Sequence, residues 1–318
     1  MTQNKLFENF SIIGDNTNKY ISRFKNILNI NSSVLITGET GTGKELIARW
    51  IHFNDSKRNK NPFVKITIPN IGENIFESEV FGYEKGAFTG AISSKKGLIE
   101  VAEAGTIFLD EIENASPSIQ SKLLQVLEDR LYRKVGDTEY KKTDARFVIA
   151  TNKDLFNEVQ ANNFRSDLFY RLAVIEVKLP PLRERGFDII QIANYYIEKY
   201  SKEVGTEINP LSDEAYKIFS SHRWPGNIRE LKNFIEKAVI FSEGKTLDLS
   251  MLPKITQTQS TNIKTLKYKE YIRHMEYELI SNTLAECNGN VEQTARLIDM
   301  SVPFVYKKIK ELDIKICL

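Results

Sequence analysis

Residues 34–51 read VLITGETGTGKELIARWI, which places an apolar run, a glycine-rich turn and an amphipathic segment in direct succession. The run 34–37 predicts a strand, and the residues after Lys44 predict a helix. The G-x-x-x-x-G-K spacing lets backbone N–H groups converge on phosphate oxygens at the helix N-terminus, while Lys44 reaches the outer phosphates. The stretch predicts a nucleotide-binding α/β domain. Its expected phosphate contacts are Gly38, Glu39, Thr40, Gly41, Thr42, Gly43, Lys44 and Glu45.

A second apolar run, at 105–109, ends in the acidic pair Asp110 and Glu111. Such a run suits a central parallel strand, and ligands of open α/β sheets lie beyond the carboxyl ends of the strands. We therefore expect Asp110 to hold Mg²⁺, and Glu111 to polarise the water that attacks the γ-phosphate of ATP. Glu45 stands where the general motif has a Ser or Thr ligand to Mg²⁺. The alternative is an acidic capping pair at the next helix.

Polar and cationic residues follow the third predicted strand, 147–150. Asn152, at its tip, can bond both the attacking water and the γ-phosphate, but an ordinary turn explains its position equally well. Arg165 and Arg171 lie six residues apart, on nearby helical faces. An arginine supplied across a subunit boundary can stabilise the transferring phosphoryl group, whereas surface salt bridges are the alternative.

The hexapeptide GAFTGA occupies positions 86–91, between the phosphate-binding turn and the acidic pair. Gly86 and Gly90 are free to take positive φ angles, and only Phe88 and Thr89 carry side chains with reach. Nothing in the hexapeptide can carry a proton or hold a metal ion. It therefore indicates a loop that changes shape and touches a partner, with a glycine-rich hairpin turn as the alternative.

The combination of GETGTGKE, FGYEKGAFTGA, GTIFLDE, FRSDLFYRL, LPPLRER and WPGNIREL is highly specific. With these motifs the chain resembles the bacterial enhancer-binding proteins, AAA+ ATPases that activate the sigma-54 form of RNA polymerase. The resemblance runs from about residue 12 to the C-terminus. It implies binding of ATP and Mg²⁺, assembly into a ring that is usually a hexamer, and ATP-driven conversion of the closed promoter complex into the open complex.

The resemblance also implies roles for individual residues. Thr89 matches the threonine that contacts the sigma factor, Arg165 and Arg171 match a pair of arginine fingers, and Arg229 matches a sensor arginine of the helical lid. A glutamate at position 45 is usual among the relatives. The sigma-contacting loop would comprise Gly86, Ala87, Phe88, Thr89, Gly90 and Ala91.

Thr67 departs from the pattern of the relatives, which commonly place there an asparagine that switches the catalytic glutamate. A threonine can still hydrogen-bond Glu111, but with a shorter reach. We therefore count Thr67 among the catalytic candidates and expect weaker coupling between nucleotide state and loop position.

Composition agrees with a protein of two or three domains that works in the cytoplasm. The chain has 318 residues, of which 41% are hydrophobic and 27% charged, and a net charge of +2. DNA contact must therefore come from a local patch rather than from a wholly basic surface. The two cysteines, Cys287 and Cys317, lack metal-binding spacing. No run approaches the roughly twenty apolar residues of a membrane span, and the N-terminus lacks the pattern of a signal peptide.

Five segments are predicted along the chain. They are a flexible lead at 1–10, an AAA+ α/β subdomain with a parallel sheet at 11–180, an all-α lid at 181–250, a polar linker at 251–266 and a helix-turn-helix at 267–318. The phosphate-binding turn begins at Gly38, so we expect no preceding receiver domain. The chain is thus most similar to the stand-alone subgroup that regulates phage-shock or type III secretion genes, where control comes from an inhibitor protein, from expression level or from truncation of a longer chain.

The last fifty or so residues resemble the Fis-like domain of the same family. Tyr271/Ile272, Met275, Leu279 and Thr283/Leu284 recur at helical spacing, Asn290 can cap a second helix, and Ser301 with Pro303 can start a third. On that third helix, residues 305, 309 and 312 should be core, and Lys310 can meet phosphates. The predicted DNA contacts are Val302, Pro303, Phe304, Tyr306, Lys307 and Lys308.

Arginine and a small polar residue are common where Val302 and Phe304 stand, so the strong arginine–guanine contact is missing. The alternative is a helical oligomerisation tail.

Together these observations predict an ATP-driven activator that binds an upstream activating sequence as dimers and acts on sigma-54 RNA polymerase as a ring. Two other classes stay open. An AAA+ remodeller or helicase of another kind would share Lys44, Asp110 and Glu111 but has no use for GAFTGA. A DNA-binding regulator that acts without the ATPase would have no need of the arginines and acids.

Overall fold

The computed structural model describes residues 14–22, 24–209, 211, 213–242, 246, 247 and 249, and in the C-terminal part 276, 277, 279–281, 283, 284, 287, 289–298, 300–312 and 314. The chain divides into two compact units, Met1–Lys254 and Ile255–Leu318. The lead predicted at 1–10 and the linker predicted at 251–266 lie outside the described residues. The five-segment division stays a prediction.

A five-stranded sheet forms the centre of the first unit, and all of its strands are parallel. Their order is β2-β5-β8-β1-β9. All six residues of β8 are buried, because helices cover both faces of the sheet, and this explains the uninterrupted apolar runs in the sequence. The predicted parallel α/β core is confirmed. The strands are β1 (Val34–Thr37), β2 (Phe63–Thr67), β5 (Thr106–Asp110), β8 (Arg146–Thr151) and β9 (Glu176–Lys178).

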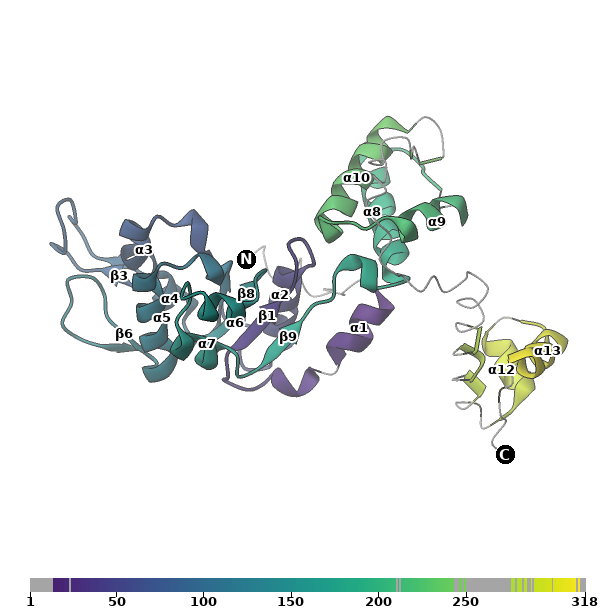
Figure 1. Ribbon diagram of the computed structural model, residues 1–318, viewed down its shortest axis with the longest axis horizontal. Coiled ribbons are helices and arrows are strands. Elements are labelled where there is room, and N and C mark those ends of the chain that lie inside the picture. Colours follow the sequence, from purple (N-terminus) through teal and green to yellow (C-terminus); the bar gives the residue numbers. More distant parts are fainter. Residues whose placement is uncertain are drawn as a thin grey trace. The chain divides into compact units, whose positions relative to one another are not determined.

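The pleat of the strands sends alternate side chains into two apolar clusters, one on each face of the sheet. Leu35 belongs to the first cluster, whereas its neighbours Val34 and Ile36 belong to the second. The first cluster is covered by α3 (Glu73–Val80), α4 (Leu98–Ala102), α5 (Pro117–Asp129), α6 (Leu155–Gln160) and α7 (Ser166–Leu172). The second is covered by α1 (Asp15–Ser22) and α2 (Lys44–Phe53) (Figure 1).

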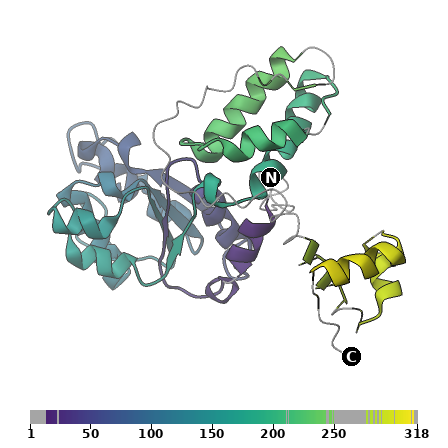
Figure 2. The same ribbon diagram turned by 45° about the vertical axis from the view of Figure 1, so that its right-hand side comes forward.

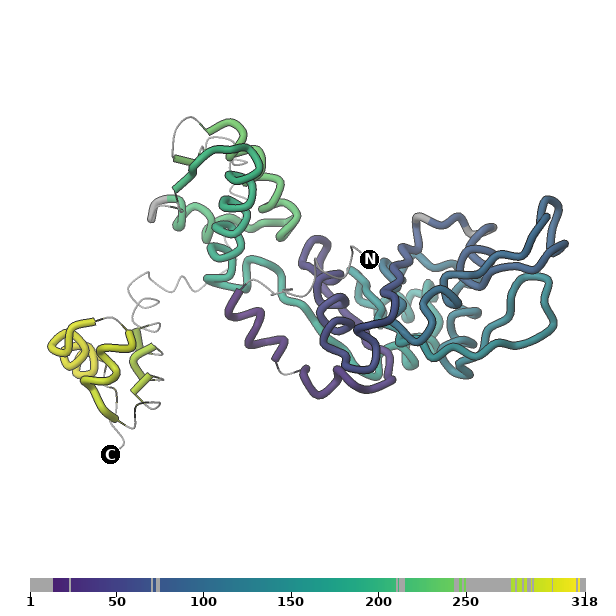
Figure 3. Tube along the Cα trace, turned by 180° about the vertical axis from the view of Figure 1, so that it is seen from behind, coloured from purple at the N-terminus to yellow at the C-terminus, as the bar shows by residue number. Residues whose placement is uncertain are grey.

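Two short hairpins project from one end of this α/β part and lie side by side (Figure 3). In the first, β3 (Gly82–Tyr83) pairs antiparallel with β4 (Lys95–Lys96) and presents the GAFTGA loop. In the second, β6 (Leu131–Tyr132) pairs with β7 (Lys141–Lys142). A parallel bridge between Tyr83 and Val135 joins the two hairpins.

The helices α8 (Asp188–Val204), α9 (Asp213–Ser221) and α10 (Asn227–Phe241) form the predicted all-α lid. Their shared core surrounds Trp224, which is fully buried and donates its indole N–H to the carbonyl of Phe219 at 2.8 Å. Burial of an indole without such a bond would be costly, so the bond fixes the turn that leads into α10. None of the described helices is long and apolar enough to cross a membrane.

The second unit contains α12 (Val291–Leu297) and α13 (Val302–Leu312), drawn in yellow in Figure 2. Asn290 caps α12 by accepting the N–H of Gln293 at 3.1 Å, as predicted. Residues 305, 309 and 312 are buried in one cluster, which confirms them as core.

One prediction about the preceding helix was wrong. Of the predicted apolar positions, Leu284 is buried as expected, but Leu279 is 49% exposed and its neighbour Ile280 is buried instead. Sequence spacing alone could not choose between these two adjacent faces. Tyr271, Ile272 and Met275, predicted for the same helix, lie outside the described residues, as does Cys317.

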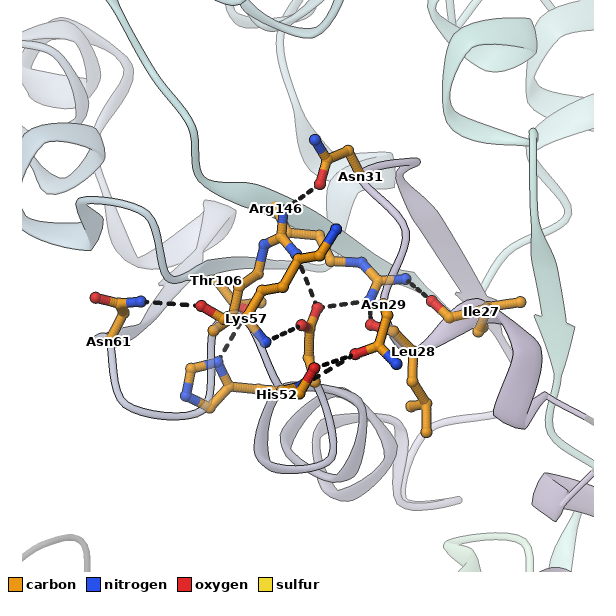
Figure 4. Close-up of polar contacts among 12 residues, drawn as sticks. Ile27, Leu28, Asn29, Asn31, His52, Lys57, Asn61, Thr106 and Arg146 are labelled. Carbon is orange, nitrogen blue, oxygen red and sulfur yellow. Dashed lines mark hydrogen bonds and ion pairs between the residues drawn. The ribbon is translucent and has the colours of Figure 1, made fainter.

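A buried ionic cluster ties the amino-terminal edge of the sheet to the segment 24–31 (Figure 4). Arg146, at the start of β8, donates to the carbonyls of Ile27 and Leu28, both at 2.6 Å, and to the carboxylate of Asp55 at 3.2 Å. Asp55 also accepts from Arg58 at 2.9 Å. Charges this deeply buried are tolerated only when they are paired and hydrogen-bonded.

His52 lies beside this cluster and is 1% exposed. Its Nδ1 lies 2.9 Å from the hydroxyl of Thr106 at the start of β5 (Figure 4). Burial lowers the pKa of His52 to about 4, although Asp55 acts in the opposite direction. The folded protein therefore holds this imidazole neutral.

We predict a pH-dependent loss of stability that originates at His52. Between pH 6.5 and 4 the unfolded chain takes up a proton that the folded chain does not, so the free energy of unfolding falls as the pH falls, by up to about 3 kcal/mol. Urea unfolding of the wild type and of His52→Gln over this pH range measures the effect. The variant should show a shallower pH dependence, and parallel curves would contradict the prediction.

Candidate functional site

The phosphate-binding turn has the geometry expected of an anion site. The helix α2 begins at Lys44, and Gly43, which precedes it, has a φ of +97° and supplies no side-chain cap. The N-terminal N–H groups of α2 are therefore open to an anionic ligand. The ammonium of Lys44 donates to the carbonyls of Gly38 and Glu39 at 2.7 and 3.1 Å, which holds it over the turn.

The acidic pair lies beside this turn, at the carboxyl end of β5. Asp110 is the last residue of the strand, and Glu111 follows with a φ of +59°. That left-handed conformation is unfavourable for a side chain with a Cβ atom and is concentrated at functional sites. Glu111 accepts a long hydrogen bond of 3.4 Å from the amide of Asn114.

Asn152 completes the arrangement from the neighbouring strand. It follows β8, and its side-chain amide donates to the hydroxyl of Thr40 at 3.2 Å. The tip of β8 therefore touches the phosphate-binding turn directly.

One pocket, of about 280 Å³, collects most of the predicted nucleotide residues. Because carboxyl ends of parallel strands meet at one edge of a sheet, residues far apart in the sequence converge there. The pocket is lined by Thr40, Gly41, Gly43, Lys44, Glu45, Lys65, Asp110, Glu111, Asn152, Ile228, Arg229, Lys232 and Asn233.

The pocket brings cationic and acidic side chains together. Burial lowers the pKa of Lys44, while Asp110, Glu113 and Glu111 act in the opposite direction. Among the described residues, no group of three or more His, Cys, Asp or Glu could hold a metal by itself. A magnesium ion fits here in its usual manner, with one or two carboxylates and the phosphate oxygens of a substrate as ligands.

Lys65 is a pocket residue that the sequence reasoning missed. Its ammonium lies 2.6 Å from Glu45 and 3.4 Å from Asp110. Burial raises the pKa of Glu45, but hydrogen bonds from Lys65 and Arg49 outweigh that effect and leave the pKa below its usual value. The available signal was period-two alternation, because Lys65 shares a face of β2 with Thr67.

Thr67 ends β2 directly opposite Asp110 in the strand register. It does not line the pocket, and among the hydrogen bonds of the described residues Glu111 pairs with Asn114 rather than with Thr67. A role for Thr67 in switching Glu111 stays a prediction.

The two predicted arginine fingers lie outside this pocket. Arg165 is exposed and bonds Asp167, with the shorter contact at 2.7 Å, and the hydroxyl of Ser121 at 3.1 Å. Arg171 donates twice to the carbonyl of Leu127, at 3.0 and 2.6 Å. Neither arginine can serve the pocket of its own chain in this conformation.

The GAFTGA loop is exposed at its tip. Gly86 and Gly90 have φ angles of +84° and +100°, as the sequence indicated. Phe88 is 47% exposed, and its ring packs edge-on against that of Tyr83, with 5.0 Å between the ring centroids. Thr89, the next residue, is also exposed. Ala91 is buried, because it closes the base of the loop through hydrogen bonds to Gly86 and Phe88.

The second hairpin supports the base of this loop. Lys134 is buried and pairs with Glu84 at 3.0 Å, and Glu84 also donates its backbone N–H to the carbonyl of Val135 at 3.0 Å. Gly136 has a φ of +79°, and a Cβ atom there would lie 2.7 Å from the Cβ of Ala87. The loop is therefore braced by close backbone contact.

The predicted DNA contacts on α13 divide into two groups. Pro303, Phe304, Tyr306 and Lys307 are exposed. Val302 packs partly against the core, and Lys308, whose side chain is 15% exposed, pairs with Glu276 at 2.8 Å and Glu311 at 3.3 Å. Lys307 and Lys310 are thus the more accessible cations of this helix.

Comparison with known families identifies three segments. Residues 12–178 match the family described as Sigma-54 interaction domain, residues 183–268 match the AAA+ ATPase lid domain, and residues 271–312 match the bacterial regulatory proteins of the Fis family.

Two curated relatives show how far the similarity extends. Regulatory protein AtoC of Escherichia coli (strain K12) is 42% identical over 291 residues, covering 89% of this chain and 63% of AtoC. Nitrogen fixation protein AnfA of Azotobacter vinelandii is 40% identical over 277 residues, covering 86% of this chain and 52% of AnfA. The chain thus spans between half and two thirds of the length of these relatives.

Solved structures show the same fold. NtrX from Brucella abortus in complex with ADP has a TM-score of 0.70 and 29% identity, covering 98% of this chain and 70% of that one. NtrX in complex with ATP has a TM-score of 0.69 and 29% identity, covering 95% of this chain and 70% of that one.

We predict that Gly136→Ala loosens the GAFTGA loop, because the added methyl group must displace Ala87. Gly205→Ala is a matched control, since Gly205 has a similar φ of +77° but nothing within 4 Å of the point that an added methyl group would occupy. Both variants should lose about 1 kcal/mol of unfolding free energy from backbone strain. Only Gly136→Ala should speed tryptic cleavage after the exposed Lys85. Equal cleavage in the two variants would contradict the predicted bracing.

Proposed function

The chain belongs to the sigma-54 interaction family, and from that premise we propose that it is an ATPase that activates transcription by sigma-54 RNA polymerase. The proposal rests chiefly on the pocket in which Lys44, Asp110, Glu111, Asn152 and Arg229 converge. The exposed GAFTGA loop and the Fis-type unit support the choice of target.

ATP is the proposed substrate. Lys44 and the N-terminus of α2 bind its phosphates, and Arg229 reaches the same pocket from the lid. Asp110 holds the magnesium ion, which neutralises phosphate charge when it is bound. Glu111 orients the attacking water and takes up its proton, and Asn152 responds to the γ-phosphate through its contact with the phosphate-binding turn.

Hydrolysis requires a ring of subunits in this proposal. Arg165 and Arg171 lie outside the pocket of their own chain, so they would reach the γ-phosphate only in the pocket of a neighbour. Arg165 is exposed and forms a surface ion pair with Asp167. Breaking this pair so that Arg165 can turn towards a neighbouring subunit would cost little, because surface ion pairs contribute about 1 kcal/mol or less. We propose assembly from dimers to a hexamer.

The partner of the GAFTGA loop would be the sigma-54 factor. The loop offers an exposed aromatic ring and a hydroxyl at its tip, with no titratable group. Such a surface binds and pushes but performs no chemistry. Hydrolysis would change the position of the loop and open the promoter complex, while α13 holds upstream DNA. We propose the bacterial cytoplasm as the site of action. A regulatory inhibitor protein is a further proposed partner.

The substitution Thr89→Ala tests the activator proposal. Because the threonine is exposed at the loop tip, ATP turnover should stay within about twofold of the wild type. Formation of the open complex with sigma-54 polymerase should be lost. Ser94→Ala removes an exposed hydroxyl from the same hairpin and should retain both activities. Lys44→Ala should lose both.

This assay also distinguishes the proposed activator from the two alternative classes of protein. A remodeller of another kind would hydrolyse ATP without ever opening the promoter. A regulator that acts without the ATPase would show no turnover that depends on Lys44.

DNA binding can be tested independently with a gel-shift series at rising salt. Each phosphate neutralised adds about one unit to the slope of log affinity against log salt concentration. Lys307→Ala should lower the slope by about one, whereas Lys308→Ala should change it less, because Lys308 is already paired with two carboxylates. The absence of salt-sensitive DNA binding would favour the oligomerisation tail.

A further inference from the structure

The side-chain amide of Asn227 joins three segments of the chain. Asn227 is the first residue of α10, is fully buried and has a φ of +53°. Its Nδ2 donates to the carboxylate of Glu39 at 3.1 Å and to the carbonyl of Thr40 at 3.0 Å. Its Oδ1 accepts the backbone N–H of Leu182 at 2.7 Å. The amide thus ties the lid to the phosphate-binding turn and to the connection between them.

Two further donors on the lid side bind the next carbonyls of the turn. The backbone N–H of Ile228 donates to the carbonyl of Gly41 at 3.0 Å. The buried guanidinium of Arg185 donates to the carbonyl of Thr42 at 2.7 Å. Three successive carbonyls of the turn are therefore held by Asn227, Ile228 and Arg185.

The consequence follows from the planarity of the peptide group. The N–H and C=O of a trans peptide point in opposite directions. Holding the carbonyls of residues 40–42 towards the lid turns the N–H groups of residues 41–43 away from it. The N–H groups of Gly41 and Gly43 can bind an anion on that side, whereas the N–H of Thr42 donates to the carbonyl of Glu39 at 3.3 Å.

Close packing keeps this arrangement tight. A Cβ atom on Gly41 would lie only 2.3 Å from the carbonyl oxygen of Gly226, so the turn can approach the lid only with glycine at that position. Glu39 is held in turn by two hydrogen bonds from Arg183, at 2.8 and 2.6 Å. Arg229 lies two residues beyond Asn227 and lines the pocket.

We propose that Asn227 is a positioning residue for nucleotide binding: its amide locks the phosphate-binding turn to the lid, so that the N–H groups of the turn and Arg229 face the phosphates together. This inference rests on the proposed ATPase function. It adds a second contribution of the lid to the phosphate site. Arg229 lines the pocket itself, and hydrogen bonds from the lid side to the carbonyl groups of the turn fix the turn's conformation.

The test is a double-mutant cycle between Asn227→Asp and Glu39→Gln in the full chain. Asn227→Asp keeps the shape and the acceptor for Leu182 but places a carboxylate against Glu39 and the carbonyl of Thr40. The affinity for a fluorescent ATP analogue should fall roughly tenfold or more, since a hydrogen bond between charged or buried groups is lost.

The double variant restores a donor and an acceptor at the same contact, with their positions exchanged. The amide introduced at position 39 can donate to the carboxylate introduced at position 227. The loss of affinity should therefore be at least about fivefold smaller than the product of the two single losses.

Steady-state kinetics and thermal unfolding exclude a merely structural role. The variant Asn227→Asp should raise KM more than it lowers kcat, and the double variant should recover KM. Arg183→Gln, at an exposed position, releases Glu39 without burying a new charge and should weaken nucleotide binding about two- to fivefold at unchanged Tm.

The inference would be overturned if the affinity loss of the double variant equalled the product of the two single losses. An unchanged nucleotide affinity in Arg183→Gln would also overturn it. A wild-type chain that bound no ATP would instead overturn the proposed function itself.

Discussion

The N–H groups and the carbonyl groups of a phosphate-binding turn point to opposite sides of its peptide planes, and in this protein the lid side hydrogen-bonds the carbonyl groups. Asn227, Ile228 and Arg185 together hold the carbonyls of residues 40–42. These bonds join the turn to the lid side at three successive residues. If Asn227 has the proposed positioning role, a change in lid position would also change phosphate binding.

The parallel sheet converts this local constraint into a site. Because all five strands run in the same direction, Asp110, Asn152 and the turn after β1 meet at one edge. The buried cluster of Asp55 and Arg146 fixes the opposite edge to the segment 24–31. The hairpin that carries GAFTGA contacts the second hairpin through Val135 and Lys134. A displacement of one hairpin would therefore strain or break these contacts with the other.

Much of the fold followed from local patterns. The apolar runs predicted β1, β5 and β8 to within a residue or two, and Asn290 was recognised as a cap because its short polar side chain suits that position. The pocket residues Lys44, Asp110 and Glu111 were found because each lies at or beyond the end of a strand in a recognisable pattern. Lys65 was missed, although it shares a face of β2 with Thr67, because the carboxylates that it contacts come from two other segments.

The sequence by itself determined the kind of chemistry, because phosphate binding and acid–base catalysis require particular residue types at short, fixed spacings. It also determined which strands are buried, since apolar runs must avoid water. Only the tertiary structure decided which charged side chains are engaged in ion pairs within the protein and which stay exposed for a ligand. Lys308 and Lys307 are neighbours of identical type, yet Glu276, 32 positions away, engages one and leaves the other exposed. Contacts between distant segments depend on the packed arrangement of the whole unit, which no local pattern encodes.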